Sequence, residues 1–234
     1  MQRPDPASIF GRYEFLVRRL HSLIGLLPVG AFLFIHFVTN FSILDGPATF
    51  QMRVDQIHSL GPITLPVVEW SCILLPIVAH ALIGLIIVAR GKRNLLYYRY
   101  ARNFRYTFQR WTGVVAFAFI AWHVFDTRGW IQESWWVAHV THPLGGGTFD
   151  AARAAATATA SVQASGWVAA AYLVGVLACV YHLANGVWTM GITWGAWTSP
   201  AAQRWATMLC AAVGLGLAVM GLGALWGMAT TVIR

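Results

Sequence analysis

Five long stretches of mainly apolar residues divide this chain of 234 residues and limit the folds open to it. They cover residues 23–44, 64–89, 108–128, 167–192 and 205–232. A helix that crosses the hydrocarbon core of a bilayer needs roughly 20 such residues, at about 1.5 Å each. The third stretch is the least apolar, and its aromatic and basic flanks suit the membrane interface. We therefore predict an all-α membrane protein with five transmembrane helices in a single domain.

The overall composition agrees with a bilayer environment. Hydrophobic residues make up 58% of the chain and charged residues only 10%, whereas about a quarter of the residues of a soluble domain are charged. The net charge of +8 does not indicate nucleic-acid binding, because the basic residues lie at the ends of the apolar stretches. Cys72, Cys179 and Cys210 lie inside apolar stretches without a CxxC spacing, so we expect packing residues and no disulfide framework.

The distribution of basic residues predicts the orientation. With five spans, one side of the membrane collects Arg3, Arg12, Arg18, Arg19, Arg90, Lys92, Arg93, Arg99, Arg102, Arg105, Arg110 and Arg204. The other side holds Arg53, Arg128, Arg153 and Arg234. Since cytoplasmic segments are enriched in Lys and Arg, we expect a cytoplasmic N-terminus and an outer C-terminus. The Ala/Thr/Ser tract of residues 151–165 in the second outer connection is open to two interpretations, a loose loop or a helical lead-in to the fourth span.

Four histidines, His36, His80, His123 and His182, lie one apiece in the first four spans among apolar residues. A polar side chain at that depth needs a reason. At the helical rise per residue, His80 and His182 each lie about 15 Å from the inner ends of their helices. By the same count, His36 lies roughly 27 Å from the inner end of the first helix, and His123 about 7 Å from the outer end of the third. The histidines therefore form an inner pair and an outer pair.

Paired histidines at matching depth are typical of b-type haem, whose iron takes one imidazole from each of two facing helices. The sequence therefore predicts two haems in a bundle formed by the first four helices. His80 and His182 would ligate the inner haem, and His36 and His123 the outer one. Any one of these histidines alone is more often a helix-to-helix hydrogen bond, so the prediction depends on their joint placement.

Smaller and polar residues near these histidines suggest further contacts. Gly84 and Gly186 follow the inner ligands by one turn and would leave space for a flat macrocycle, although glycine also serves plain helix packing. His21 and Ser22 lie at the inner interface, where they are candidates for holding the propionates of the inner haem. Contact with lipid phosphate is an equal alternative for this basic segment.

Seven short segments carry a resemblance to a known family. They are RRLHS (18–22), PVGAFLFIH (28–36), LPIVAHALIG (75–84), QRWTG (109–113), WHVFDTR (122–128), HLANGVW (182–188) and ITWG (192–195). In this order they resemble the five-helix, di-haem cytochrome b membrane-anchor subunit of bacterial succinate dehydrogenases and the related fumarate reductases. The resemblance covers four of the five predicted helices and implies the same two pairs of haem ligands.

The resemblance also implies a function and partners. The chain would carry electrons from an iron-sulfur subunit through two b haems to a quinone, with menaquinone expected, in the cytoplasmic membrane of a bacterium. A flavoprotein subunit that oxidises succinate would join the iron-sulfur subunit on the cytoplasmic side, and a higher oligomer of the complex stays open. Relatives that return protons through the membrane carry a glutamate where this chain has Val180, so we do not expect that proton path here.

Succinate chemistry itself is not expected on this chain, because it has no dinucleotide fingerprint, thiolate cluster motif or catalytic triad pattern. Quinone reduction also takes up protons, and Glu69, near the outer end of the second span, is the candidate for that transfer. An interfacial hydrogen bond is the alternative role for Glu69. Three other functions remain open: a di-haem anchor of a hydrogenase or formate dehydrogenase, the same complex acting as a fumarate reductase, and a haem-free anchor or transporter.

Overall fold

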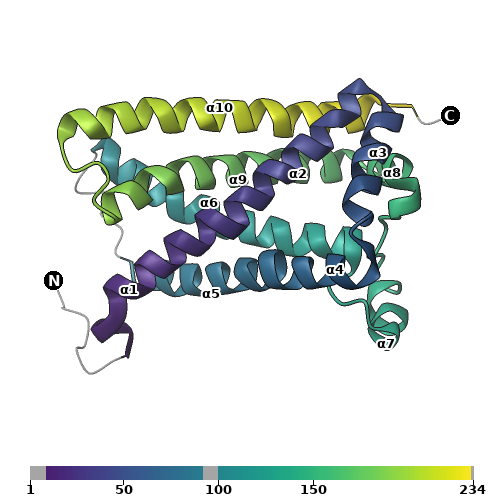
Figure 1. Cartoon of the computed structure of the whole chain (residues 1–234), viewed down its shortest axis with the longest axis horizontal. Helices are drawn as coiled ribbons and strands as arrows, with labels where there is room; N and C mark the ends of the chain where they lie inside the picture. Colours follow the sequence, from purple (N-terminus) through teal and green to yellow (C-terminus); the bar gives the residue numbers. More distant parts are fainter. Residues whose placement is uncertain (1–8, 92–99, 233–234) are drawn as a thin grey trace.

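The computed structural model describes residues 9–91 and 100–232, and all regular elements in those ranges are helical (Figure 1). The first span consists of α1 (Ile9–Ile24), the π-helical turn η1 (Gly25–Gly30) and α2 (Ala31–Phe41). The second consists of α4 (Gly61–Val68), the π-helical turn η3 (Glu69–Leu74) and α5 (Leu75–Ala89). Three long helices are continuous, namely α6 (Ala101–Arg128), α9 (Gly166–Thr193) and α10 (Pro200–Thr230). The shorter elements are η2 (Ser42–Asp45), α3 (Pro47–His58), α7 (Ser134–Trp136), η4 (Val137–Thr141), η5 (Ala151–Arg153) and α8 (Ala154–Gln163).

Four helical segments are long and apolar enough to cross a membrane. They are Tyr13–Asp45, Gly61–Ala89, Gly166–Thr193 and Pro200–Thr230, and they match the first, second, fourth and fifth predicted spans. Many of their large apolar side chains are exposed, such as Ile63 at 79%, as expected where lipid tails provide an apolar surrounding. The third predicted span corresponds to α6, a helix of 28 residues that begins with several basic residues. Its crossing of the membrane stays a prediction.

The helices lie side by side, and the first span runs diagonally across the others (Figure 1). Pro28 lies inside η1, where its missing N–H removes one helical hydrogen bond and accounts for the wide turn. At its start the first span contacts α5, and at its end it contacts α10. This diagonal course allows one helix to reach both ends of the bundle.

The two ends of the bundle differ in charge and in covering. We call the end where α1 begins the basic end, because among the described residues it carries Arg12, Arg18, Arg19, Arg90, Arg102, Arg105, Arg110 and Arg204. The opposite end, which carries Arg53, Arg128 and Arg153, is covered by α3, α7 and α8 (Figure 1), and we call it the capped end. Arg3, Lys92, Arg93, Arg99 and Arg234 lie outside the described residues.

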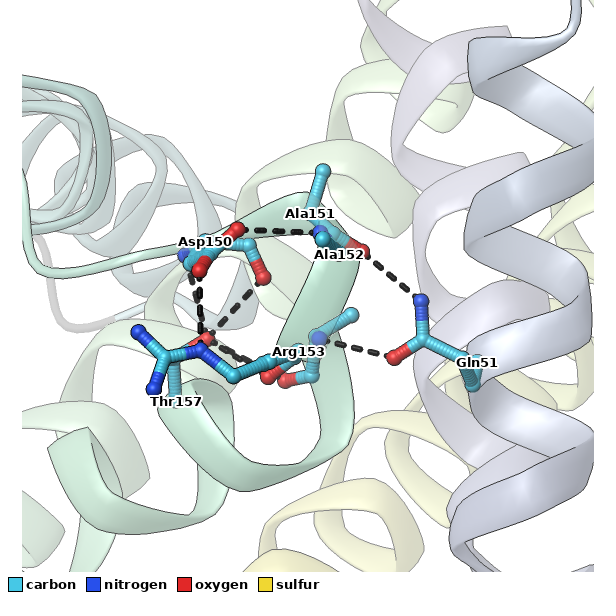
Figure 2. Close-up of polar contacts among 7 residues, drawn as sticks. Gln51, Asp150, Ala151, Ala152, Arg153 and Thr157 are labelled. Carbon is cyan, nitrogen blue, oxygen red and sulfur yellow. Dashed lines mark hydrogen bonds and ion pairs between the residues drawn. The ribbon is translucent and has the colours of Figure 1, made fainter.

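The capped end is held together by polar contacts that join α3 to η5 and to the start of α8 (Figure 2). Gln51 Nε2 donates to the carbonyl of Ala151 (2.7 Å), and Gln51 Oε1 accepts from the N–H of Ala154 (2.8 Å). The Asp150 carboxylate accepts hydrogen bonds from Arg153 Nε and from the backbone N–H of Ala152. These two hydrogen bonds hold the pKa of the Asp150 carboxyl below its usual range. The tract of residues 151–165 is thus helical, as η5 and α8, and not a loose loop, but it is a separate helix from α9, because Ser165 caps the start of α9.

Clusters of buried residues lie at the capped end and along α9. Ile43, Phe50, Val54, Ala154, Ala155, Val162 and Met228 form one buried cluster that joins η2, α3, α8 and α10. A second cluster of Phe37, Val176, Val180 and Leu217 joins α2, α9 and α10. Of the cysteines expected to be packing residues, Cys179 and Cys210 are buried and Cys72 is exposed. These contacts fix α9 in the centre of the bundle, with α6 against it.

Candidate haem-binding cavity

A cavity of about 1040 Å³ extends between the helices from the basic end to the capped end. Its wall includes His21 and Ser22 near the basic end and Thr148 and Phe149 at the capped end. Most of the lining is aliphatic or aromatic, and it includes all four histidines predicted as ligands. Cavities that bind small molecules are usually about 300–1,000 Å³, so this one suits a large, mainly apolar ligand.

The four histidines form two pairs inside this cavity. The ring centroids of His36 and His123 lie 5.9 Å apart, and those of His80 and His182 also lie 5.9 Å apart. A metal-to-imidazole bond is about 2.0 Å long. The distance from the metal to the ring centroid is this bond plus the radius of the ring, which is about half of the separation between the two centroids. Each pair is therefore spaced as two imidazoles on opposite sides of one metal ion. The pairs are those that helical depth predicts.

Three of the four imidazoles have their Nδ1 atom engaged. His80 Nδ1 lies 2.9 Å from the carbonyl oxygen of His21, and His182 Nδ1 lies 3.0 Å from that of Gln109. His123 Nδ1 lies 3.0 Å from the hydroxyl of Tyr172. Histidines that bind metals commonly donate their second ring N–H in this way, which fixes the tautomer and leaves Nε2 for the metal. The donor set fits axial ligation of haem iron.

The pairs suit haem better than a bare metal ion. Within residues 9–91 and 100–232, no three His, Cys, Asp or Glu side chains converge into a metal-binding group. Structural zinc takes four protein ligands, so two imidazoles are an incomplete set for it. Haem iron needs only axial ligands from the protein, because the porphyrin supplies the other four.

His21 and Ser22 lie in the cavity wall beside the inner pair, and both already have contacts within the protein. The His21 ring stacks on the His80 ring, with centroids 3.9 Å apart and planes within 9°. Its Nδ1 is buried without a hydrogen-bond partner. The Ser22 hydroxyl donates to the carbonyl of Arg19 and accepts from Trp194 Nε1. The arrangement supports a packing role for His21, and contact with haem propionates stays a prediction for both residues.

Two glycines that sequence reasoning missed permit the close approach of neighbouring helices to the inner pair. A Cβ atom at Gly25 would lie 2.4 Å from His80 Cε1, and one at Gly113 would lie 2.7 Å from His182 Cε1. The glycines singled out in the sequence have other neighbours: Gly84 faces His21, and Gly186 faces only the end of the Gln109 side chain. Gly25 and Gly113 lie on neighbouring helices, so spacing along the ligand's own helix could not identify them, and space for a macrocycle at Gly84 and Gly186 stays a prediction.

A chain of polar side chains connects the basic end with the inner pair. Arg105 Nε donates to Asn185 Oδ1 (2.9 Å), and its guanidinium lies 3.8 Å over the ring of Trp188. Asn185 Nδ2 donates to Gln109 Oε1 (2.8 Å), and Gln109 Nε2 donates to the carbonyl of His182 (3.0 Å). The polar residues Gln109 and Asn185 inside apolar helices were the available sequence signal. This chain fixes α6 against α9 at the position of the ligand.

Glu69 lies in the cavity wall near the capped end, where it forms an ion pair with Arg128. Both side chains are partly exposed, and Arg128 Nε is buried without a partner. Asn40 and Thr127, one turn beyond the outer histidines, also line the cavity, but each donates to the histidine carbonyl of its own helix. Glu69 and Arg128 thus place an ion pair in the wall of the cavity that also holds the outer histidines.

Comparison with known proteins gives the family. No family model matches the chain. The chain is 33% identical over 216 residues to the succinate dehydrogenase cytochrome b558 subunit of Bacillus subtilis (strain 168), and the match covers 92% of this chain and 98% of that protein. The similarity thus extends far beyond the seven short segments that carried the resemblance, which it confirms. With its apolar helices and paired histidines, the chain belongs to the family of succinate dehydrogenase cytochrome b subunits, multi-pass membrane proteins.

Proposed function

We propose that this chain is the di-haem membrane anchor of a succinate:quinone oxidoreductase, and that it carries electrons across the membrane to a quinone. The observation that carries the proposal is the pair of equal 5.9 Å histidine separations in one cavity that extends along the bundle. His80 and His182 would ligate the haem nearer the basic end, and His36 and His123 the haem nearer the capped end. The similarity to a cytochrome b subunit of succinate dehydrogenase supports haem b as the cofactor.

The proposal includes α6 as the third of five spans. At about 1.5 Å per residue, a helix of this length is longer than the hydrocarbon core, which is about 30 Å thick. Its arginines near the basic end would then lie in the headgroup region. The excess of arginine at the basic end supports a cytoplasmic location for that end and an outer location for the capped end, in the cytoplasmic membrane of a bacterium.

The partner subunits would bind at the basic end. Succinate oxidation requires a flavoprotein, and an iron-sulfur subunit would pass the electrons to the inner haem. The haems, when bound, supply the one-electron steps across the membrane. An electron that moves from the negative inner side to the positive outer side of an energised membrane lowers its free energy by about 2.3 kcal/mol per 100 mV. This decrease favours reduction of a low-potential quinone such as menaquinone. The same complex working in reverse would be a fumarate reductase.

Glu69 and Arg128 would handle the quinone at the capped end. Reduction of a quinone to a quinol adds two electrons and two protons, so each carbonyl oxygen gains a proton. Arg128 Nε is buried without a partner and can donate to a quinone oxygen as negative charge develops on it. The Glu69 carboxylate can then take a proton from water at the capped end and deliver it to the quinone.

One experiment on the purified complex tests both parts of the proposal. With succinate as the only electron donor, we expect a reduced-minus-oxidised spectrum of bis-histidine b haems. Electrons from succinate can reach the haems only through the partner subunits. Glu69→Gln should slow quinone turnover and leave both haem spectra unchanged. Glu133→Gln is the matched control, because Glu133 is exposed at the same end and caps α7. Absence of any haem spectrum would falsify the central proposal, and unchanged turnover in Glu69→Gln would refute the role of that residue alone.

A further inference from the structure

The outer histidine pair has a hydrogen-bond partner of a different kind from the inner pair. His80 and His182 both direct Nδ1 to backbone carbonyls, which no side-chain substitution removes. Gln109 Nε2 also lies 3.3 Å from His182 Nδ1, but an amide nitrogen is a donor and cannot accept from a protonated Nδ1. His123 instead has the hydroxyl of Tyr172 on α9, at 3.0 Å. The two rings also pack edge to face, with centroids 5.5 Å apart. Of these three contacts, this one alone depends on a side chain.

The contact continues toward the capped end. Ser161 on α8 lines the same cavity as Tyr172, and the Ser161 hydroxyl donates to Asp126 Oδ2 (2.8 Å). Asp126 lies on α6, three residues after His123. Two hydroxyl groups in the cavity wall, those of Tyr172 and Ser161, thus lie between the imidazole of His123 and a carboxylate at the capped end.

The chemistry of the ligand fixes the direction of the hydrogen bond between His123 and Tyr172. A histidine that binds iron through Nε2 carries its proton on Nδ1, so the Tyr172 oxygen must accept from His123. The proton of the Tyr172 hydroxyl is then available for donation, and we infer that Ser161, whose own hydroxyl donates to the Asp126 carboxylate, accepts it. Hydrogen bonds aligned in one direction strengthen one another. The ring of His123 becomes a better electron donor when its N–H is held by such an acceptor.

We propose that Tyr172, backed by Ser161 and Asp126, is a positioning residue that lowers the reduction potential of the outer haem relative to a haem without this contact. Greater electron donation from His123 stabilises ferric iron more than ferrous iron, and second-sphere hydrogen bonding is one of the main means by which proteins adjust haem potentials. The inference rests on the proposed binding of haem between His36 and His123. It assigns to Tyr172, Ser161 and Asp126 a role separate from quinone chemistry.

Redox titration of the purified complex, with the two haems followed by their spectra, tests the inference. Tyr172→Phe keeps the ring and removes the hydroxyl, so we expect the midpoint potential of the outer haem to rise while that of the inner haem stays constant. The low-spin electron paramagnetic resonance signal of the outer haem should shift as well. Tyr181→Phe is the matched control, since Tyr181 lies on the same helix and its ring packs against Phe108, whereas that of Tyr172 packs against His123.

Two further variants keep the test decisive if Tyr172→Phe fails to assemble. Ser161→Ala and Asp126→Asn do not touch the histidine, and each should raise the potential of the outer haem by a smaller shift of the same sign. An outer haem whose potential and resonance signal are the same in all assembled variants would overturn the inference. A wild-type complex with no haem between His36 and His123 would instead overturn the proposed function, so the two failures are distinguishable.

Discussion

A single methyl group at Gly25 should remove the inner haem and spare the outer one. The Cβ atom of an alanine there would lie 2.4 Å from His80 Cε1, whereas carbon atoms in contact are about 3.5–4.0 Å apart. The ring must therefore move by about 1 Å or more. His80 is also held through its contact with the carbonyl of His21. Because a metal-to-imidazole bond is only about 2.0 Å long, a shift of this size takes Nε2 out of bonding distance.

The cost to the fold should be much smaller than the cost to the cofactor. Overpacking of a well-packed interior costs about 1–3 kcal/mol. Alanine recovers part of this, since it is favoured over glycine in a helix by about 1 kcal/mol. We therefore expect Gly25→Ala to assemble with about half of the haem per complex. Gly113→Ala, whose Cβ would lie 2.7 Å from His182 Cε1, should remove the same haem from the other side.

Haem content per complex, measured by pyridine haemochrome, and the resolved spectra of the two haems test this prediction. Gly216→Ala is the control, because its Cβ would meet nothing within 4 Å. This control should keep two haems. Full retention of the inner haem in Gly25→Ala, or loss of the outer haem in its place, would refute the reasoning.

Three further predictions concern the ends of the bundle. Gln51→Ala should destabilise the capped end by about 1–3 kcal/mol, since it leaves two backbone groups without partners, whereas Gln56→Ala on the same helix should change stability by less than about 0.5 kcal/mol; thermal unfolding in detergent compares them. Asn185→Leu should shift the midpoint potential of the inner haem and leave that of the outer haem constant in a redox titration. Because the pKa of Asp150 is lowered in the folded protein, its contribution to stability is present above its unfolded pKa of about 4 and is lost as the pH falls through the folded value. Asp150→Asn should therefore remove this acid-dependent part of the unfolding midpoint.

The histidine pairs could be predicted from the sequence because they depend on one coordinate only, the depth of a residue along its helix. The rise per residue is fixed, so counting from the charged ends of the spans places His80 level with His182 and His36 level with His123. The long apolar stretches could be predicted for a similar reason, since the thickness of the bilayer sets their length.

Contacts between helices could not be predicted in this way, because they depend on how each helix is rotated about its own axis and how it is tilted. Gly84 lies one turn after His80, and that spacing suggested space for a macrocycle, yet it faces His21. Gly25 touches His80 from another helix, 55 positions away in the sequence. The same limit applies to Tyr172, which meets His123 only because α9 presents its side chain toward α6 at that level.

The diagonal course of the first span explains how one helix can serve both histidine pairs. A helix parallel to its neighbours would keep the same partner along its whole length, whereas this span begins against α5 and ends against α10 (Figure 1). Near its start it places His21 on the ring of His80, and further along it places His36 opposite His123. The wide turn around Pro28 lies between these two contacts and changes the rotation of the helix there. Restoring a regular helix with Pro28→Ala should therefore disturb the alignment of His36 with His123 more than the ligation of the inner pair, and loss of inner haem alone in that variant would contradict this explanation.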